Sequence, residues 1–147
     1  MSKLINISEA ASIAVHAMVL IARSGEMMNA GQLSVITGFS KNHISKVLNI
    51  LAREQFLDSE RGPKGGFILR KNPEDITLLM VYEVVDGSIN QQPCANQCSL
   101  CLASGCVFGG FSVLFTNEFR GYLAQSRLSD LMKEKSVELP EKQTILI

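Results

Sequence analysis

Apolar positions in the first third of the chain repeat at helical spacing in three blocks. Ser8 is a typical helix N-cap, and the repeat that follows it ends at Gly25. Asn29 and Gly38 delimit a second, short helix, and Ser40 caps a third. The pattern therefore predicts three helices, of which the last two are joined by a short glycine-containing turn, as in a helix-turn-helix.

The predicted third helix runs to about Glu54 and has two opposite faces at 100° per residue. Its apolar face consists of Ile44, Val47, Leu48 and Leu51. The opposite face carries only hydrogen-bonding and cationic side chains, namely Asn42, Ser45, Lys46, Asn49 and Arg53. A merely solvated helix face usually mixes Glu with Lys, so this acid-free stripe predicts contact with phosphate oxygens and base edges.

We predict that this helix binds double-stranded DNA. Asn42, Ser45 and Lys46 are expected to face the major groove. The predicted DNA-contacting residues at the start of the helix, near phosphates or bases, are Ser40, Lys41 and His43.

Residues 56–69 predict a β-hairpin, because Phe67 and Leu69 alternate with polar neighbours and the tip reads Arg-Gly-Pro-Lys-Gly-Gly. A hairpin directly after a recognition helix is a wing. Arg61 and Lys64 place two cations on its tip, where they are expected to contact the minor groove and the flanking backbone. The alternative is an ordinary turn with incidental charges.

Asn72-Pro73 interrupts the chain, and a fourth helix follows from Asp75 or Thr77 to Gly87. Residues 88–106 form a cysteine-rich segment whose first part has no helical periodicity. Aromatic residues then recur at intervals of three or four, which predicts one face of a long helix over residues 106–125, formed by Phe108, Phe111, Phe115, Phe119 and Tyr122.

We expect this aromatic stripe to pack against a second copy of the chain as well as its own, which makes the long helix a dimerisation helix. The alternative is a purely intramolecular core. The predicted fold is therefore mostly α with a small β-hairpin wing. Its parts are a winged helix-turn-helix over residues 1–72, a linker helix, cysteine segment and dimerisation helix over 73–132, and a mobile tail over 133–147.

All four cysteines of the chain lie within thirteen residues, in the order Cys94, Cys98, Cys101 and Cys106. In an intracellular chain such clustering indicates metal or redox chemistry rather than a structural disulfide framework. Thiolates are soft ligands that suit iron–sulfur clusters and zinc. Zinc usually takes cysteine pairs from two separated knuckles, so one compressed segment favours an iron–sulfur cluster. Zinc, or a thiol switch without metal, remains open.

Composition places the chain among globular proteins, with 46% hydrophobic and 19% charged residues. No run of eighteen apolar residues and no secretory signal is present, so we expect a cytoplasmic protein with no membrane association. The formal net charge is zero, but residues 1–72 hold nine basic and five acidic residues, whereas the rest of the chain has the reverse balance. The positive half is the predicted DNA-binding module.

No enzyme is expected, because neither His16 nor His43 accompanies a nucleophile in a recognisable catalytic motif. Two other functions remain open. The first is a regulator of the same fold whose cysteines form a metal-free thiol switch. The second is an iron–sulfur or zinc protein that does not bind DNA.

The run from Ser59 to Leu69, followed by Asn72-Pro73, resembles the wing signature of the Rrf-two-type winged-helix regulators. Ile76-Thr77-Leu78, the cysteine segment and Leu128-Ser129-Asp130-Leu131 also match that family's layout, so the resemblance covers roughly residues 3–132. It implies a homodimeric, DNA-binding transcriptional regulator, with the long C-terminal helix as the dimer interface. It also implies an iron–sulfur cluster held by three cysteines, through which the protein senses iron–sulfur status, nitric oxide or redox state.

Carried onto this sequence, the resemblance makes Cys94 and Cys106 the outer ligands and favours Cys101 over Cys98 as the middle one. The chain departs from the family pattern in its fourth cysteine. It also departs in Gly109, which replaces the ligating His of IscR-like members.

The fourth ligand is therefore open between two candidates. One is Cys98, and the other is a carboxylate from the partner subunit, as in NsrR-like members. Glu9 is the matching carboxylate, although an acid in the first turn of a helix also simply favours the helix dipole.

Overall fold

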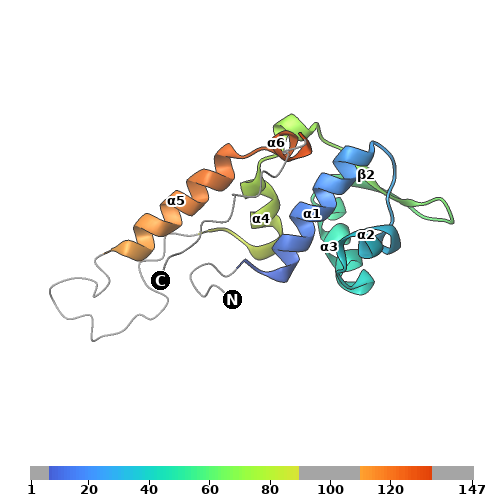
Figure 1. Ribbon diagram of the computed structural model, residues 1–147, viewed down its shortest axis with the longest axis horizontal. Helices are drawn as coiled ribbons and strands as arrows, with labels where there is room; N and C mark the ends of the chain where they lie inside the picture. The colour runs from blue at the N-terminus through green and yellow to red at the C-terminus, as the bar shows by residue number, and fades with distance from the viewer. Residues whose placement is uncertain (1–6, 90–109, 134–147) are drawn as a thin grey trace, which may run out of the picture.

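The computed structural model describes residues 7–89 and 110–133, and these form a helical body with one β-hairpin (Figure 1). The elements follow in the order α1 (Glu9–Ser24), α2 (Ala30–Thr37), α3 (Lys41–Arg53), β1 (Leu57–Glu60), β2 (Gly66–Leu69), the short 3-10 helix η1 (Pro73–Asp75), α4 (Leu78–Asp86), α5 (Phe111–Gln125) and α6 (Leu128–Met132). The predicted class, mostly α with a small hairpin wing, is confirmed.

The first two helices begin at the predicted N-caps. The Ser8 hydroxyl accepts a hydrogen bond from the Ala11 N–H at 3.0 Å. Asn29 and Gln32 form a reciprocal capping box, each side chain accepting from the other's backbone N–H at 2.9 Å. These bonds satisfy N–H groups that have no partner within the helix, and so they fix where α1 and α2 start.

Ser40 occupies the N-cap position of α3 but its hydroxyl makes no capping hydrogen bond, which corrects the predicted cap. The difference is local geometry. The backbone ψ of Ser40 is 128°, whereas ψ is 153° at Ser8 and 164° at Asn29, where the side chain does cap.

The hairpin pairs β1 with β2 antiparallel, from Leu57 opposite Leu69 to Glu60 opposite Gly66. It is fastened to the body through Met28, in the link between α1 and α2. The Met28 N–H donates to the Phe67 carbonyl at 3.0 Å, and the Phe67 N–H donates to the Met28 carbonyl at 2.8 Å. No pattern of residues predicts this third pairing, because Met28 is a single residue between two helices.

The fourth helix begins at Thr77, one of the two predicted starts, whose hydroxyl accepts from the Met80 N–H at 3.2 Å. α5 begins at Phe111, and the first residues of the predicted helix, 106–109, lie outside the described part of the chain. α6 was not predicted as a helix. It returns beside η1 and α4 through hydrogen bonds from the Leu128 N–H to the Ile76 carbonyl and from the Leu78 N–H to the Ser126 carbonyl, each 2.9 Å long.

One apolar core joins elements from both halves of the chain. α1 is at its centre, with Ile13, Met18 and Ile21 fully buried, and α3 contributes its predicted apolar face of Ile44, Val47, Leu48 and Leu51. The same core includes Ile76, Val81 and Leu128 from beyond residue 72. The division into modules at residue 72 stays a prediction, and the core is continuous across it.

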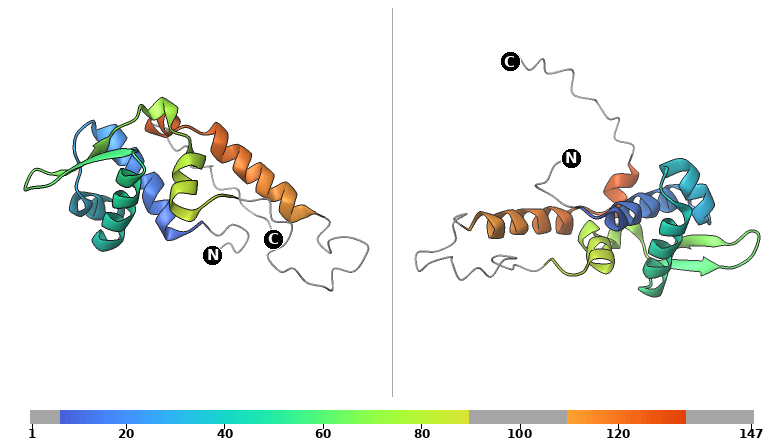
Figure 2. Two further views of the ribbon diagram at one scale, coloured as in Figure 1. Left: turned by 180° about the vertical axis from the view of Figure 1, so that it is seen from behind. Right: turned by 90° about the horizontal axis from the view of Figure 1, so that it is seen from below.

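α5 leaves this body close to α6 and extends away from it, whereas the hairpin projects from the opposite end (Figures 1 and 2). Among the described residues, a small second cluster holds the C-terminal part of α5, where Leu123 packs with Leu78 and Leu79 of α4. The two projections lie at opposite ends of the described part of the chain.

Candidate nucleic-acid interface and cysteine segment

The recognition-helix candidate α3 has the two-faced character that its sequence predicts. Its four apolar residues are buried, so the polar stripe is turned outward. On that stripe Asn42, Lys46, Asn49 and Arg53 are exposed and Ser45 is partly exposed, and Lys41 in the first turn is exposed as well. The helix packs on α1, α2 and β1, and the wing follows it directly along the chain.

Four cations of the candidate interface have no acidic partner within residues 7–89 and 110–133. These are Lys41 and Lys46 on α3 and Arg61 and Lys64 at the hairpin tip, and all four are exposed. A cation that is not neutralised within its own chain is available to phosphate oxygens. The charges therefore gather on α3 and the adjoining hairpin.

Glycines give the wing its narrow shape. A Cβ on Gly65 would lie 2.3 Å from the Glu60 carbonyl oxygen, and a Cβ on Gly66 would lie 2.7 Å from the Met28 backbone. Neither distance is possible for a real side chain. The Gly65 N–H closes the tip by donating to the Gly62 carbonyl at 3.0 Å. Close backbone approach on both sides of the hairpin therefore explains the two adjacent glycines.

The structure brings together two predicted site residues that the sequence assigned to different roles. His43, on α3, places its Nδ1 3.2 Å from Oε2 of Glu9, at the start of α1. The His43 side chain is half-buried, whereas its neighbours Lys41 and Asn42 are exposed. Within one chain, Glu9 is therefore a partner of the recognition-helix candidate.

Further contacts connect the start of α1 to α4, and α4 to α5. The Ser8 hydroxyl, beside Glu9, donates to Asp86 Oδ1 at 2.5 Å. Burial, followed by the charge of Asp86 and a hydrogen bond to its carboxylate, raises the pKa of Tyr82 above its usual 10.0. The Tyr82 ring meets Phe119 of α5 edge to face, with 5.8 Å between ring centroids. These contacts link α3, α1, α4 and α5, and sequence reasoning missed Ser8, Tyr82 and Asp86 as a group.

The four predicted ligands Cys94, Cys98, Cys101 and Cys106 lie outside the described residues, so their arrangement stays a prediction. Among the described residues no group of three or more His, Cys, Asp or Glu side chains is placed to hold a metal ion. The four thiols of the cysteine segment have the soft-donor chemistry that an iron–sulfur cluster requires.

The exposed face of α5 is unusually apolar. Phe111, Leu114 and Tyr122 are 59%, 61% and 66% exposed, and the Phe111 and Phe115 rings stack with centroids 6.2 Å apart. At about 100° per residue only Leu114 lies directly opposite Leu123, which faces α4, while Phe111 and Tyr122 lie roughly a third of a turn from it. The predicted single stripe is thus divided, because Phe119 packs on its own chain while Tyr122 does not. Phe108 lies outside the described residues.

A helix-turn-helix followed by a hairpin wing, with a long projecting C-terminal helix, defines the class of winged-helix transcriptional regulators. Residues 7–134 match the model of the Rrf2 family, described as iron-dependent transcriptional regulators. The chain therefore belongs to the Rrf2 family, and the resemblance expected from its wing and cysteine segment is confirmed. Its relatives are transcriptional regulators rather than enzymes.

Individual relatives agree with this assignment. The HTH-type transcriptional regulator NsrR of Bacillus subtilis is 31% identical over 129 residues, which cover 84% of this chain and 86% of that protein. The structure is similar in fold to CymR, the global cysteine regulator of B. subtilis, with a TM-score of 0.72, 17% identity and coverage of 88% and 97%. It is also similar in fold to T. potens IscR, with a TM-score of 0.71, 18% identity and 95% of each chain covered.

No helix in the described ranges is both long enough and apolar enough to cross a membrane.

Proposed function

We propose that the chain is a homodimeric, DNA-binding regulator that senses iron–sulfur status, nitric oxide or redox state through an iron–sulfur cluster on its cysteine segment. The observation that carries the DNA-binding part is the acid-free outer face of α3 beside a wing whose two tip cations have no acidic partner among the described residues. The relatives NsrR and IscR are transcriptional regulators of the same family and support the proposal.

In this proposal α3 enters the major groove. Asn42, Ser45 and Lys46 read base edges, while Ser40 and Lys41 meet phosphates at the start of the helix. The Ser40 hydroxyl is free for this role because it does not cap α3. Arg61 and Lys64 follow the backbone into the neighbouring minor groove, where a narrow hairpin with glycine on both sides of its tip can approach closely.

Self-association through α5 supplies the second DNA-binding head. The exposed Phe111, Leu114 and Tyr122 form an apolar face on a projecting helix, and burial of that face against a second copy removes it from water. A two-fold dimer then presents two α3 helices to two half-sites of one duplex.

The proposed cluster ligands are Cys94, Cys101 and Cys106, with the fourth position taken by Cys98 or by Glu9 of the partner subunit. When bound, the cluster supplies a redox-active and nitric-oxide-reactive centre. The chain's own residues connect that segment to DNA. Ser8 and Asp86 join α1 to the end of α4, which leads into the segment, and Glu9 joins α1 to His43 on α3. Any change that moves Glu9 or the end of α4 is thereby passed to the recognition helix.

The DNA-binding part is tested by fluorescence anisotropy on duplexes selected from a random-sequence library. We expect the dissociation constant to rise steeply with salt, and Lys46→Gln to reduce the slope of log Kd against log salt by about 1. Lys133→Gln, which removes the same charge at the end of α6, leaves the slope unchanged. Absence of saturable binding to any duplex by both metal-loaded and metal-free protein would overturn the proposal.

The cluster is tested by anaerobic purification with visible absorption and with iron and sulfide quantified. We expect Cys94→Ala, Cys101→Ala and Cys106→Ala each to lose iron, whereas Cys98→Ala keeps it if Glu9 is the fourth ligand. A colourless wild-type protein without iron or sulfide after anaerobic reconstitution would instead favour the metal-free thiol switch.

A further inference from the structure

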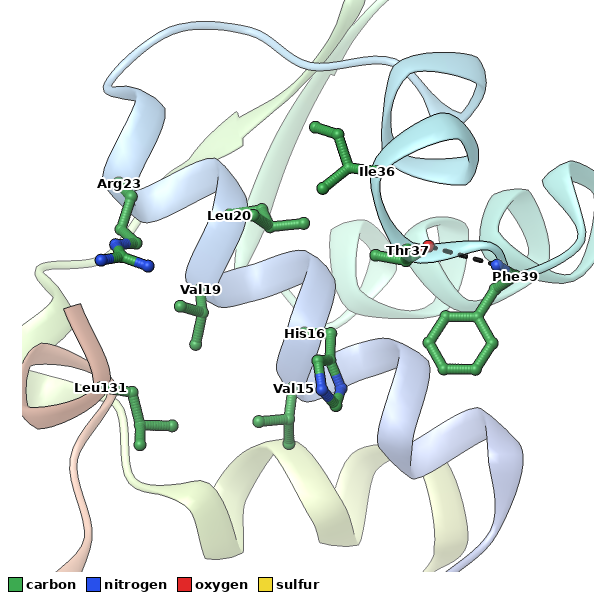
Figure 3. A pocket seen from close by; sticks show the side chains of 9 residues that line it. All are labelled: Val15, His16, Val19, Leu20, Arg23, Ile36, Thr37, Phe39 and Leu131. Carbon is green, nitrogen blue, oxygen red and sulfur yellow. Dashed lines mark hydrogen bonds between the residues drawn. The ribbon is translucent and has the colours of Figure 1, made fainter. Parts of the chain in front are cut away.

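An apolar pocket of about 530 Å³ lies between α1, the turn that joins α2 to α3, and α6. Its walls include Val19 and Leu20 of α1, Ile36 at the end of α2, Phe39 in the turn and Leu131 of α6 (Figure 3). This volume is within the range of small-molecule sites, which are mostly apolar with a few polar groups that fix orientation. None of these residues is among the proposed DNA contacts or the proposed cluster ligands.

The charge at the pocket has one sign. Figure 3 shows the Arg23 guanidinium at one end of the pocket and Phe39 at the other. Among the described residues no Asp or Glu lines the pocket, and Arg23 has no acidic partner there. A guanidinium binds a carboxylate with two parallel hydrogen bonds. The pocket thus combines an apolar wall with a single unpaired cation at its edge.

The wall between these two ends is ordered by its own contacts. His16 donates from Nδ1 to the Ser12 carbonyl at 2.7 Å, which sets the orientation of its ring, and the ring meets Phe39 edge to face with 6.1 Å between centroids. Phe39 is held in turn, because the Ser34 hydroxyl donates to its carbonyl at 2.6 Å and its N–H donates to the Thr37 hydroxyl at 3.3 Å. The apolar end of the pocket is therefore pre-formed.

From this geometry we infer that the pocket binds an amphipathic monocarboxylate, with its carboxylate on Arg23 and its apolar body along Val19 and Leu20 toward Phe39. Phe39 directly precedes Ser40, the N-cap residue of α3, so an occupant touches the turn that sets the position of the recognition helix. A change of DNA affinity on occupancy follows from this contact and rests on the proposed function. Binding of the carboxylate in the pocket does not depend on the proposed function.

Titration calorimetry of the full chain with sodium octanoate tests the site, with octanamide as the uncharged comparison. We expect octanoate to bind in a saturable way and more tightly than octanamide. Arg23→Gln is expected to raise the octanoate Kd about tenfold or more, because it removes a charge-assisted hydrogen-bond pair. The matched variant Arg70→Gln removes one positive charge on the hairpin side and leaves the Kd within about twofold.

The apolar wall has its own matched pair of variants. Ile36 lines the pocket and is 58% exposed, so Ile36→Ser folds normally, and we expect it to raise the octanoate Kd about fivefold. Its neighbour Val35 is 87% exposed and does not line the pocket, so Val35→Ser leaves the Kd unchanged. Equal loss in both variants would indicate non-specific binding of an amphiphile and overturn the site.

Three further results would also overturn it. They are no saturable octanoate binding, equal affinity for octanamide, or octanoate binding that excludes self-association, which would assign the pocket to a second copy of the chain. DNA affinity is measured separately with and without octanoate. A protein that binds octanoate but no DNA contradicts the proposed function and leaves the pocket assignment intact.

Discussion

At the scale of single residues, close backbone contacts decide which positions of the wing tolerate a side chain. Gly66 faces the Met28 backbone, and a Cβ there would meet it at 2.7 Å. Because both partners are backbone atoms joined by the Met28–Phe67 hydrogen bonds, neither can move away without breaking this pairing. Gly66 is thus required by packing, not by an unusual φ angle.

Gly66→Ala is expected to lower the free energy of unfolding by roughly 1–3 kcal/mol, the usual cost of overpacking a filled space. Urea denaturation at a fixed protein concentration measures this change. Ser59→Ala, on the exposed face of the paired strand, is the control and should change stability by less than about 0.5 kcal/mol. An unchanged midpoint in Gly66→Ala would contradict the close approach of Met28.

Asn29 caps its helix through its side chain and Ser40 does not, so removing the two side chains should change the free energy of unfolding by different amounts. Asn29→Ala removes one half of a capping box and is expected to cost about 0.5–2 kcal/mol. Ser40→Ala removes no capping bond and should leave the free energy of unfolding nearly unchanged, while it weakens DNA binding through the lost phosphate contact. Denaturation and anisotropy on the same two variants separate stability from binding, and an equal loss of stability in both would contradict the difference in capping.

Residue patterns predicted the helix starts at Ser8 and Asn29, and offered Thr77 as one of two starts for α4, because a capping side chain acts within three residues of itself. They could not predict that Ser40 leaves α3 uncapped, since that depends on how tightly the turn after Gly38 bends. They also missed the Glu9–His43 pair, which joins residues thirty-four positions apart on two different helices. This contact depends on the angle at which α1 and α3 pack against each other, which the local sequence does not determine.

At the scale of elements, α5 has two faces with different partners. Leu123 and Phe119 face α4 of the same chain, whereas Phe111, Leu114 and Tyr122 remain exposed. The intervals of three and four residues predicted the part of the helix over Phe111–Gln125 correctly. They could not divide its aromatic residues between the two faces, because consecutive members of the stripe differ by up to 60° around the axis.

Leu114→Glu should convert the proposed dimer to a monomer, because it places a charge in the middle of the apolar face that a second copy would bury. Sedimentation velocity or light scattering after size exclusion measures the change in mass. Ala124→Glu adds the same charge at an exposed position outside the apolar face and should leave the mass unchanged. A wild-type chain that is monomeric at all concentrations would contradict the assignment of α5.

The short helix α6 could not be predicted from the spacing of apolar residues. It has five residues, too few for a helical period to repeat, and its position depends on hydrogen bonds with Ile76 and Leu78 about fifty residues earlier. The same limit applies to Met28, which pairs with the wing as a single residue. Both features are long-range pairings and neither has a local signature.

At the scale of the whole molecule, α6 packs back onto the N-terminal helices and contributes to the same core as the helix-turn-helix. Leu128 is completely buried among residues of the N-terminal core, together with Ile76 and Val81. α6 therefore fixes the end of α5 to the body, and it determines the direction in which the proposed dimerisation helix leaves it.

Leu128→Ala should lower the free energy of unfolding by roughly 2–5 kcal/mol, because it leaves a cavity in the shared core. Met80→Ala, at a partly exposed position on α4, is the control and is expected to cost much less. Denaturant unfolding followed by circular dichroism measures both. If the loss for Leu128→Ala were below about 1 kcal/mol, α6 would not belong to the core as described.

The return of α6 also has a consequence for synthesis. The core around α1 is built from the earliest described residues, but it is complete only when Leu128 arrives, near the end of the described chain. The helices proposed to contact DNA therefore leave the ribosome well before their packing is finished, and until then Ile76 and Val81 lack one of their neighbours. Translation that stalls between these points leaves a nascent chain with an open apolar surface, so the core that supports α3 is complete only after α6 has been made.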